Sequence, residues 1–437
     1  MATLSLSSGT IQQSTFDKTG DGFQYDTIFL KNGNYIAAKP YQFNSGTTLT
    51  GDPGAIITLA PSVSETLFPA MTPVFGQIEK TISDITVENI TFCGNWDKQT
   101  VYHGDGYHNF IGLSNCSGLK INNITAGDNK GDIARIKDSK DILFSGNKIN
   151  GCGHDGLFTE RCKNVEACNN KIKVRINSGL RCKGSSNVSF HNNNIQRVES
   201  LGPATGPLIQ VENSRANETT NNVQIFENYL EGAQGPGIWA AAHTASSLDA
   251  AKNLIIRNNL IKNCGNMPAS INLPTVAGVS VDGWNDVLIE NNTIDSNLGY
   301  GIYFGKYLTT SANTGYTATV RRNIITNTKK NLVGSGGTGI YNQGKYDLTL
   351  DENCMYGNVA NGITGINDIL SDPLFVSPDT NDYRLRDNSP CRFSGYQLGA
   401  YTNAEETPTE LLVSCSGYDA DIVSKTLTGE YEIYRRI

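Results

Sequence analysis

Apolar and polar positions alternate in short runs along most of the chain, and these runs recur as one phrase. The phrase consists of apolar, any residue, apolar, two further positions, Asn, any residue and apolar, as in ILFSGNKI from Ile142 and VLIENNTI from Val287. Its Asn recurs at Asn147, Asn170, Asn193, Asn228, Asn259, Asn292, Asn323 and Asn353. The intervals between successive copies, namely 23, 23, 35, 31, 33, 31 and 30, indicate a repeat protein.

A second phrase, Gly, apolar, any residue, apolar, lies between the copies, as in GLFT at Gly156 and GLRC at Gly179. Each unit therefore contains two or three short strands of period two, separated by turns rich in Asn and Gly. A 23-residue unit is too short for a propeller blade of about 40 to 45 residues, and a leucine-rich framework is missing. The pattern predicts an all-β chain, a single parallel β-helix of roughly ten or more coils stacked about 4.8 Å apart.

The two ends differ from the repeat region. We expect residues 1–82 to form an N-terminal cap and the first coils, and residues 83–370 to form the β-helix repeats. Residues 371–437 lose the repeat and predict a closing segment followed by a more charged tail. Such ends are needed because the open edges of a solenoid must be covered.

Composition supports this fold. There are 47 Asn and 45 Gly, more of either than of Lys and Arg together (35), and both are poor helix formers and good turn formers. We expect each repeat Asn to occupy a turn, with a left-handed backbone and an amide bonded to the next coil. The same turn chemistry accounts for the Asn-X-Ser/Thr sequons at Asn89, Asn115, Asn123, Asn187, Asn217 and Asn291.

Charge and cysteine content restrict the function. A net charge of −7 disfavours a nucleic-acid partner, and no apolar run is long enough for a membrane span. The start MATLSLSSGT lacks the features of a secretory signal. Ten cysteines occur without a CxxC pair, which disfavours a zinc ribbon or a redox dithiol. Buried thiols are favoured, and a local disulfide among the four cysteines from Cys152 to Cys182 stays open.

Particular phrases resemble a known superfamily. VLIENNTI followed by GYGIYF, with the later SDPLF, YRL and SPC, resembles right-handed parallel β-helix proteins of the pectin-lyase-like superfamily. CGHDGLFTERCKNVEACNNKI from Cys152 is most similar to disaggregatase-related proteins of methanogenic archaea. That resemblance implies an extracellular or cell-surface protein acting on methanochondroitin, a polysaccharide that contains uronic acid. The chain departs from the polygalacturonase pattern because RIK at 135–137 precedes GHDG at 153–156, and no NTD triplet occurs.

Aligning three coils on the repeat Asn predicts which side chains share the outer face of a strand. One outward row contains Arg135, Phe158 and Arg181, and the next contains Lys137, Glu160 and Lys183. Just before the strand lie Asp132, His154 and Asp155. Later coils add Gln210, Glu212, Trp239, Asp282 and Tyr303.

These rows predict a groove for an anionic sugar, because Arg binds carboxylates with two prongs and aromatic rings stack on sugars. The coils between Asp128 and Arg197 lack insertions, so we expect this face to be open there. The alternative is a surface ion-pair ladder, worth about 0 to 1 kcal/mol per pair. Weaker candidates for a metal or substrate loop are residues 103–108 (HGDGYH) and His243.

Two kinds of chemistry fit these residues. Glycoside hydrolysis uses two carboxylates about 5 to 9.5 Å apart. Elimination or epimerisation uses a base such as Lys183, and an Arg or bound Ca²⁺ to neutralise the uronate. His154 suits either scheme. The predicted catalytic residues are Asp155, His154, Glu160, Asp132 and Lys183, and the predicted substrate-binding residues are Arg135, Lys137, Phe158, Arg181, Gln210, Glu212, Trp239, Asp282 and Tyr303.

The sequence therefore predicts an enzyme that degrades an acidic extracellular polysaccharide, with glycoside hydrolysis favoured. A lyase or epimerase is the alternative, with or without calcium. A non-catalytic carbohydrate-binding surface protein or tailspike is the third reading. The metal ligands and a role for calcium stay open, no nucleic-acid partner is expected, and a homo-oligomer stays open.

Overall fold

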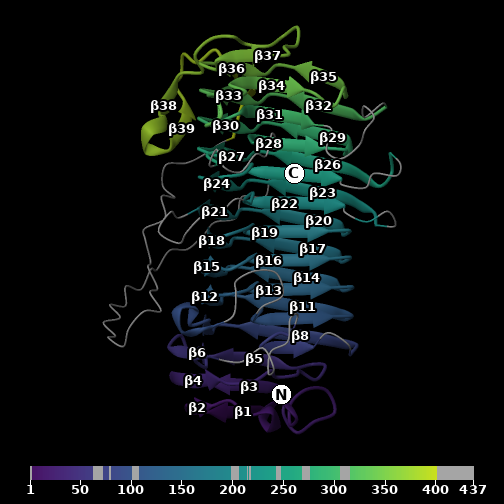
Figure 1. Cartoon of the computed structure of the whole chain (residues 1–437), viewed down its shortest axis with the longest axis vertical. Helices are drawn as coiled ribbons and strands as arrows, with labels where there is room; N and C mark the ends of the chain where they lie inside the picture. The colour runs from purple at the N-terminus through teal and green to yellow at the C-terminus, as the bar shows by residue number, and fades with distance from the viewer. Residues whose placement is uncertain are drawn as a thin grey trace.

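The computed structural model describes residues 2–62, 72–77, 80–100, 108–197, 206–213, 215, 218–242, 248–267, 276–305 and 315–400. These residues form one elongated solenoid whose coils stack along the long axis (Figure 1). Three long parallel sheets run the length of the solenoid, and each regular coil contributes one strand to every sheet. The predicted parallel β-helix is confirmed.

Sheet 1 has thirteen strands: β1 (Thr3–Leu6), β3 (Thr27–Leu30), β5 (Thr48–Gly51), β8 (Ile82–Glu88), β11 (Cys116–Asn122), β14 (Lys140–Ser145), β17 (Lys163–Cys168), β20 (Ser186–His191), β23 (Thr220–Phe226), β26 (Ala251–Arg257), β29 (Asn285–Glu290), β32 (Thr317–Arg321) and β35 (Asp347–Asp351). Sheet 2 has eleven: β7 (Phe75–Gln77), β10 (Ile111–Ser114), β13 (Ala134–Lys137), β16 (Leu157–Glu160), β19 (Leu180–Lys183), β22 (Ile209–Asn213), β25 (Ile238–Ala242), β28 (Ala277–Asp282), β31 (Tyr300–Gly305), β34 (Thr338–Asn342) and β37 (Ala360–Gly362). Sheet 3 has thirteen: β2 (Gly9–Thr10), β4 (Gly33–Ala37), β6 (Ala55–Leu59), β9 (Thr91–Cys93), β12 (Thr125–Asn129), β15 (Lys148–Cys152), β18 (Lys171–Val174), β21 (Asn194–Arg197), β24 (Tyr229–Glu231), β27 (Leu260–Lys262), β30 (Thr293–Asp295), β33 (Ile324–Thr326) and β36 (Cys354–Tyr356).

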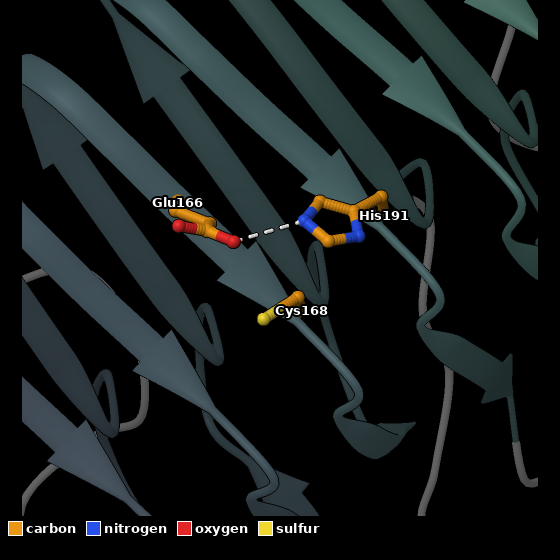
Figure 2. Close-up of side chains that lie close together, drawn as sticks. All are labelled: Glu166, Cys168 and His191. Atoms are coloured by element: carbon orange, nitrogen blue, oxygen red, sulfur yellow. Dashed lines mark hydrogen bonds and ion pairs between the residues drawn. The ribbon is translucent and has the colours of Figure 1, made fainter. Parts of the chain in front are cut away.

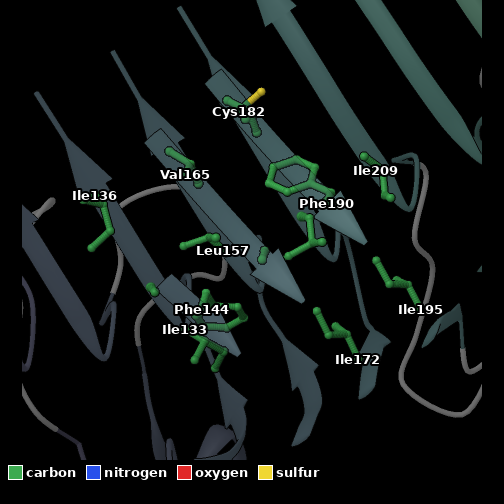
Figure 3. Close-up of a cluster of buried hydrophobic side chains, with 14 of the residues drawn as sticks. Ile133, Ile136, Phe144, Leu157, Val165, Ile172, Cys182, Phe190, Ile195 and Ile209 are labelled. Atoms are coloured by element: carbon green, nitrogen blue, oxygen red, sulfur yellow. The ribbon is translucent and has the colours of Figure 1, made fainter. Parts of the chain in front are cut away.

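The apolar side chains of all three sheets point inward and stack from coil to coil. Leu157 of sheet 2, Val165 of sheet 1 and Ile172 of sheet 3 belong to one coil and meet in the same core (Figure 3). The core excludes larger side chains at the Gly of the second phrase. A Cβ on Gly179 would lie 2.6 Å from Ile195, so only Gly lets sheet 2 approach sheet 3 this closely.

A ladder of buried Asn side chains joins the coils. The Asn170 Oδ1 accepts the Asn147 backbone N–H at 3.0 Å, and the same contact recurs at each later repeat Asn. Each Nδ2 also donates to a backbone carbonyl of the preceding coil, as from Asn170 to Phe144 at 2.9 Å. Asp368 ends the ladder by accepting the Asn353 N–H at 2.8 Å.

The prediction that each repeat Asn has a left-handed backbone is wrong by one position. Positive φ occurs at the position before the repeat Asn, as at Asn169 (56°) and Asn258 (54°), and the repeat Asn themselves are buried. Five of the six sequon Asn also have positive φ, namely Asn89, Asn115, Asn123, Asn187 and Asn291. Asn217 lies outside the described residues.

The ends of the solenoid are built differently from its middle. At the start, helix α1 (Gln13–Phe16) takes the place of a sheet 2 strand, and Phe16 packs against Tyr41, Phe43 and Phe75. Near the other end, the pairs β38 (Phe375–Ser377) with β39 (Asp382–Leu385), and β40 (Arg392–Phe393) with β41 (Tyr396–Gln397), are antiparallel. Short helices η1 (Trp96–Lys98) and η3 (Pro378–Thr380) complete the described elements.

Residues 371–400 pack beside sheet 3 rather than over the end of the solenoid (Figure 1). Tyr383 and Leu398 share an apolar cluster with Leu260 and Ile324 of sheet 3, and the Tyr383 hydroxyl donates to Asp295 at 2.8 Å. The expectation that this segment closes the end is therefore corrected. The charged tail beyond Ala400 lies outside the described residues.

The nine cysteines within the described residues are buried and form no disulfide with one another, and this includes the four from Cys152 to Cys182. They pack as small apolar side chains. Cys415 lies outside the described residues.

Because the ladder Asn are buried, we expect their substitution to lower the free energy of unfolding more than substitution of an exposed Asn does. Asn259→Ala should lower the free energy of unfolding by about 2 to 5 kcal/mol, because the Asn228 N–H and the Ile225 carbonyl lose their buried side-chain partner. The measurement is equilibrium unfolding in urea. Asn222→Gly is the control, since it removes exposed amide contacts, keeps the left-handed backbone and should cost under about 1 kcal/mol. Equal losses in both variants would contradict the role of the buried ladder.

Candidate functional site

The outward rows of sheet 2 have the register that the sequence predicts. Arg135 pairs with Phe158 and Phe158 with Arg181, followed by Gln210 and Trp239. In the neighbouring row, Lys137, Glu160, Lys183 and Glu212 follow one another. Asp282 continues the second row and Tyr303 the first. All of these residues therefore lie on one face of sheet 2.

Two guanidinium groups flank one aromatic ring in the first row. The guanidinium carbons of Arg135 and Arg181 lie 4.5 and 4.4 Å from the centre of the Phe158 ring. Arg135 comes from the preceding coil and Arg181 from the following coil. The ring thus holds both cations in place by cation–π attraction, worth about 0.5 to 2 kcal/mol for each pair.

A second ladder of polar side chains runs along the turn before these strands. Asn109 accepts the Asp132 N–H, Asp132 accepts the Asp155 N–H, and Asp155 accepts the Ser178 N–H, at 2.8 to 3.0 Å. Both carboxylates are fully buried. Each therefore has one oxygen committed to the backbone of the next coil.

His154 lies between the two buried carboxylates. Its Nδ1 is 2.8 Å from Asp132 Oδ1 and 3.0 Å from Asp155 Oδ2, so this nitrogen carries a proton and donates it. Its Nε2 faces away from them, 3.3 Å from the Asn177 amide nitrogen, and the side chain is 14% exposed. Nε2 is therefore the nitrogen that can exchange a proton with a ligand.

Electrostatics hold His154 in its charged form. Burial alone would lower its pKa, but Asp155 and Asp132 outweigh burial and raise the pKa to about 10. Burial also acts on the carboxylates: it raises the pKa of Asp132, whereas at Asp155 the charges of His154 and Arg181 prevail and the pKa is lowered. The site at neutral pH is therefore an imidazolium between two carboxyl groups.

Arg181 and His154 both contact Asp155 Oδ2, and Arg181 also reaches from the first outward row to Glu212 in the second. It lies 3.5 Å from Asp155 and donates to Glu212 Oε1 through Nε at 2.9 Å and through NH2 at 2.5 Å. The Arg181 side chain is 16% exposed. Burial opposes its charge, but Asp155 and Glu212 raise the pKa of Arg181, which stays a fixed positive charge.

Glu160, which belongs to the second row, is surrounded by cations. Its carboxylate contacts Lys137 at 3.4 Å, Arg161 at 2.5 Å and Arg215 at 3.4 Å. Burial works against the charge, but Lys137, Arg161 and Lys183 outweigh burial and lower the pKa of Glu160. Glu160 is only 3% exposed, so its carboxylate is committed to the protein.

The expectation of an open face between Asp128 and Arg197 is wrong in its centre. Arg135, Phe158 and Glu160 are 7% or less exposed, and Gln210, Glu212, Asp282 and Tyr303 are 5% or less. In later coils Trp239 Nε1 donates to Asp282 at 3.1 Å, and the Tyr303 hydroxyl donates to Gln343. Among the predicted site residues, the partly exposed ones are Lys137, His154, Arg181, Lys183 and Trp239.

Several contributing residues were not predicted. Asn109 and Ser178 extend the ladder of Asp132 and Asp155, and the signal was available because all four positions are 23 residues apart. Asn177 lies 23 residues after His154 for the same reason. Arg161 and Arg215 carried no such signal, because neither belongs to the two outward rows of sheet 2.

Two clusters among the described residues have the side chains to hold a metal ion, namely Asp132, His154 and Asp155, and Glu166, Cys168 and His191. In the first, the second carboxylate oxygens already pair with Arg135 at 3.3 Å and with Arg181 at 3.5 Å. Calcium prefers six to eight oxygen ligands, so this site does not fit calcium.

His108 is fully buried with its pKa lowered to about 4, first by burial and then by Lys130. Residues 101–107 and His243 lie outside the described residues.

Family models agree with the fold. The model for a right-handed β-helix region matches residues 78–250, and the model described as disaggregatase related matches residues 220–406. The chain is thus a right-handed parallel β-helix. No match was found among curated proteins. Within the described residues no helix is long and apolar enough to cross a membrane.

Solved structures with similar folds are distant in sequence. The A-module of the mannuronan C-5 epimerase AlgE6 of Azotobacter vinelandii has a TM-score of 0.55 and 16% identity, over 79% of this chain and 89% of that chain. The catalytic domain of a GH87 α-1,3-glucanase has a TM-score of 0.54 and 12% identity, over 80% of this chain and 62% of that chain. At these identities the likeness concerns the fold alone.

The carboxylates around His154 predict a measurable shift in its titration. Asp132→Asn should bring the pKa of His154 down toward its ordinary value of 6.5, because one of two groups that favour the imidazolium is removed. NMR of the ring nitrogens against pH measures this. Because the folded pKa is raised, the stability that His154 contributes is complete below pH 6.5 and is lost as pH rises toward about 10.

Asp138→Asn is the matched control for this titration. Asp138 is exposed and pairs with Arg161, so its removal should leave the titration of His154 nearly unchanged. A His154 that titrates near 6.5 in the unmodified protein would contradict the arrangement.

Proposed function

We propose that this chain acts on an acidic polysaccharide, with His154 transferring a proton and Arg181 binding a uronate carboxylate. One observation carries this proposal: two buried carboxylates hold His154 by Nδ1, so that Nε2 points away from them toward Asn177, in a side chain that is 14% exposed and lies beside a partly exposed arginine. Together these groups provide a proton-transfer atom and a carboxylate-binding cation close to each other. A reaction at the carbon beside a sugar carboxylate needs both a group that transfers a proton and a cation that binds the carboxylate.

The burial of the carboxylates bears on the class of reaction. Hydrolysis by the usual route needs two carboxyl groups that reach the glycosidic bond from opposite sides. Asp132 and Asp155 have no exposed surface, and Glu160 and Glu212 are 3% exposed and bound to cations. This arrangement favours the second reaction class considered from the sequence, removal of a proton beside the uronate carboxylate.

The residues suit each part of that step. Neutral His154 takes the proton from the carbon next to the carboxylate at Nε2, and the two electrons of the C–H bond move onto the carboxylate, where Arg181 balances the charge. In elimination, these electrons return to form a C=C bond while the C–O bond to the bridging oxygen breaks, and that oxygen takes a proton from protonated His154 or from water, which gives an unsaturated sugar and a new chain end. Return of a proton to the opposite face gives the epimer instead.

Two independent findings support the polymer class. The disaggregatase-related match agrees with the sequence resemblance, which implies methanochondroitin or a similar uronic-acid polymer at the cell surface. The two folds of TM-score above 0.5 belong to proteins described as a mannuronan epimerase and an α-1,3-glucanase. Both of those descriptions name enzymes of polysaccharides.

Hydrolysis stays as the second candidate because of one observation. The raised pKa of His154 keeps its ring protonated at neutral pH, which is the form that a general acid needs to protonate a leaving oxygen. In that scheme Arg181 again binds the uronate. The two candidate reactions therefore differ in the active protonation state of His154: proton abstraction needs the neutral ring, and hydrolysis needs the protonated ring.

Substitution of the proton-transfer group should abolish most of the activity. His154→Gln should lower turnover of a uronic-acid polysaccharide by about 10² to 10⁴-fold, because Gln exchanges no proton. Arg181→Lys should weaken both substrate binding and turnover, since Lys cannot bind a carboxylate with two prongs. Product is measured as reducing ends, as enone absorbance and as a change in sugar composition.

Arg321→Lys is the matched control, because Arg321 pairs with Glu290 on sheet 1, away from His154. It should leave turnover unchanged. Full turnover in His154→Gln would sink the assignment, and polymer binding without any product would favour a carbohydrate-binding protein.

The pH profile distinguishes the two candidate reactions. Proton abstraction requires neutral His154, so activity should rise with pH through the raised pKa of this residue. Hydrolysis with His154 as acid should instead lose activity over the same range. In either case Asp132→Asn should move the midpoint to lower pH, and a midpoint that does not move would exclude His154 as the titrating group.

A further inference from the structure

A second cluster of chemically reactive side chains lies on sheet 1, away from the outer face of sheet 2. Glu166 and Cys168 are two residues apart on β17, so both side chains leave the same face of the strand. His191 on β20 pairs directly with Cys168 in the next coil. Figure 2 shows Glu166 and His191 pointing toward each other with Cys168 beside them.

The three side chains have the spacing of a metal site. Their nearest ligand atoms all lie within 4.8 Å of one another, and Glu166 Oε1 is 3.1 Å from His191 Nε2. Ligands about 2.1 Å from a tetrahedral zinc ion lie about 3.4 Å apart. Small side-chain rotations would therefore bring all three onto one ion.

A chain of polar contacts orients the imidazole for this role. Asn192 donates its amide to Glu227 at 3.1 Å, which turns its oxygen toward His191 Nδ1 at 2.7 Å. Nδ1 therefore carries a proton and Nε2 faces Glu166. Metal-binding histidines commonly donate their second ring nitrogen to such an acceptor. The ring also stacks on Phe226 at 4.7 Å with an interplanar angle of 4°, which limits its rotation.

The surroundings of the thiol disfavour its anionic form. Burial, followed by the charge of Glu166, raises the pKa of Cys168 to about 11. A divalent cation reverses this balance, because it stabilises the thiolate and neutralises the carboxylate. Access is available along Glu166, whose side chain is 53% exposed.

We propose that Glu166, Cys168 and His191 bind a divalent transition-metal ion, with Zn²⁺ as the best match. Thiolate and imidazole ligands exclude Ca²⁺ and Mg²⁺ and suit zinc, which takes three protein ligands and a water when the fourth position is open. The ion would tie two successive coils of sheet 1 together. This site does not depend on the polysaccharide chemistry at His154.

Cobalt provides a direct test, since a thiolate bound to Co²⁺ gives a charge-transfer absorption band. The full-length protein titrated with CoCl₂ should develop this band, and added ZnSO₄ should remove it by competition. Metal binding should tighten as pH rises, because Cys168 must lose its proton. No band in the unmodified protein would overturn the proposal.

Two variants separate this site from others in the chain. Cys168→Ser should lose the band, and Cys93→Ser should retain it, although both cysteines are 6% exposed. Glu166→Gln should keep the fold, because Glu166 is exposed, and should raise the Kd for Co²⁺ at least about tenfold. A band that persists in Cys168→Ser, or an unchanged Kd in Glu166→Gln, would contradict the site. The cluster at His154 offers two carboxylates and an imidazole, which give no thiolate band.

Discussion

The structure depends on the stacking of one coil on the next in fixed register. Buried Asn side chains enforce that register, since each amide accepts a backbone N–H of the preceding coil and donates to a carbonyl there. A shift of one residue would leave these buried groups without partners and turn the apolar side chains outward. The ladder therefore specifies both the core and the residues that meet on each outer face. The side chains of both candidate sites are brought together by this alignment.

The alignment concentrates charge on sheet 2, where burial makes every charge depend on its neighbours. Asp155 is fully buried and is stabilised by His154, Arg181 and the Ser178 N–H. Removing one member of such a network leaves an uncompensated buried charge, which costs more than an exposed ion pair contributes. The network therefore explains why the rows cannot be a simple surface ladder. It also fixes the His154 ring, with Nδ1 at the two carboxylates and Nε2 toward Asn177.

The sequence predicts the part of this arrangement that depends on spacing. The rows of Arg135, Phe158 and Arg181 follow from the constant repeat length, and so does the proximity of Asp132 to Asp155. Burial of Glu160 could not be predicted, because it depends on Arg161 and Arg215, which lie outside the rows. The orientation of the His154 ring could not be predicted either, since it depends on which ring nitrogen contacts the carboxylates. These features depend on side-chain contacts, whereas the repeat reports only backbone register.

In a β-helix, chemically reactive groups meet across coils rather than within local motifs. His154 contacts Asp132 of the preceding coil, and His191 pairs with Cys168 of the preceding coil. Both clusters fall in the stretch where successive repeat Asn are 23 residues apart. Beyond Arg197 the repeats are longer, and the first row of sheet 2 changes to Gln210, Trp239, Ser280 and Tyr303. Constant coil length thus keeps charged side chains close enough to act together, and it is the reason that both candidate sites occur in the same three coils.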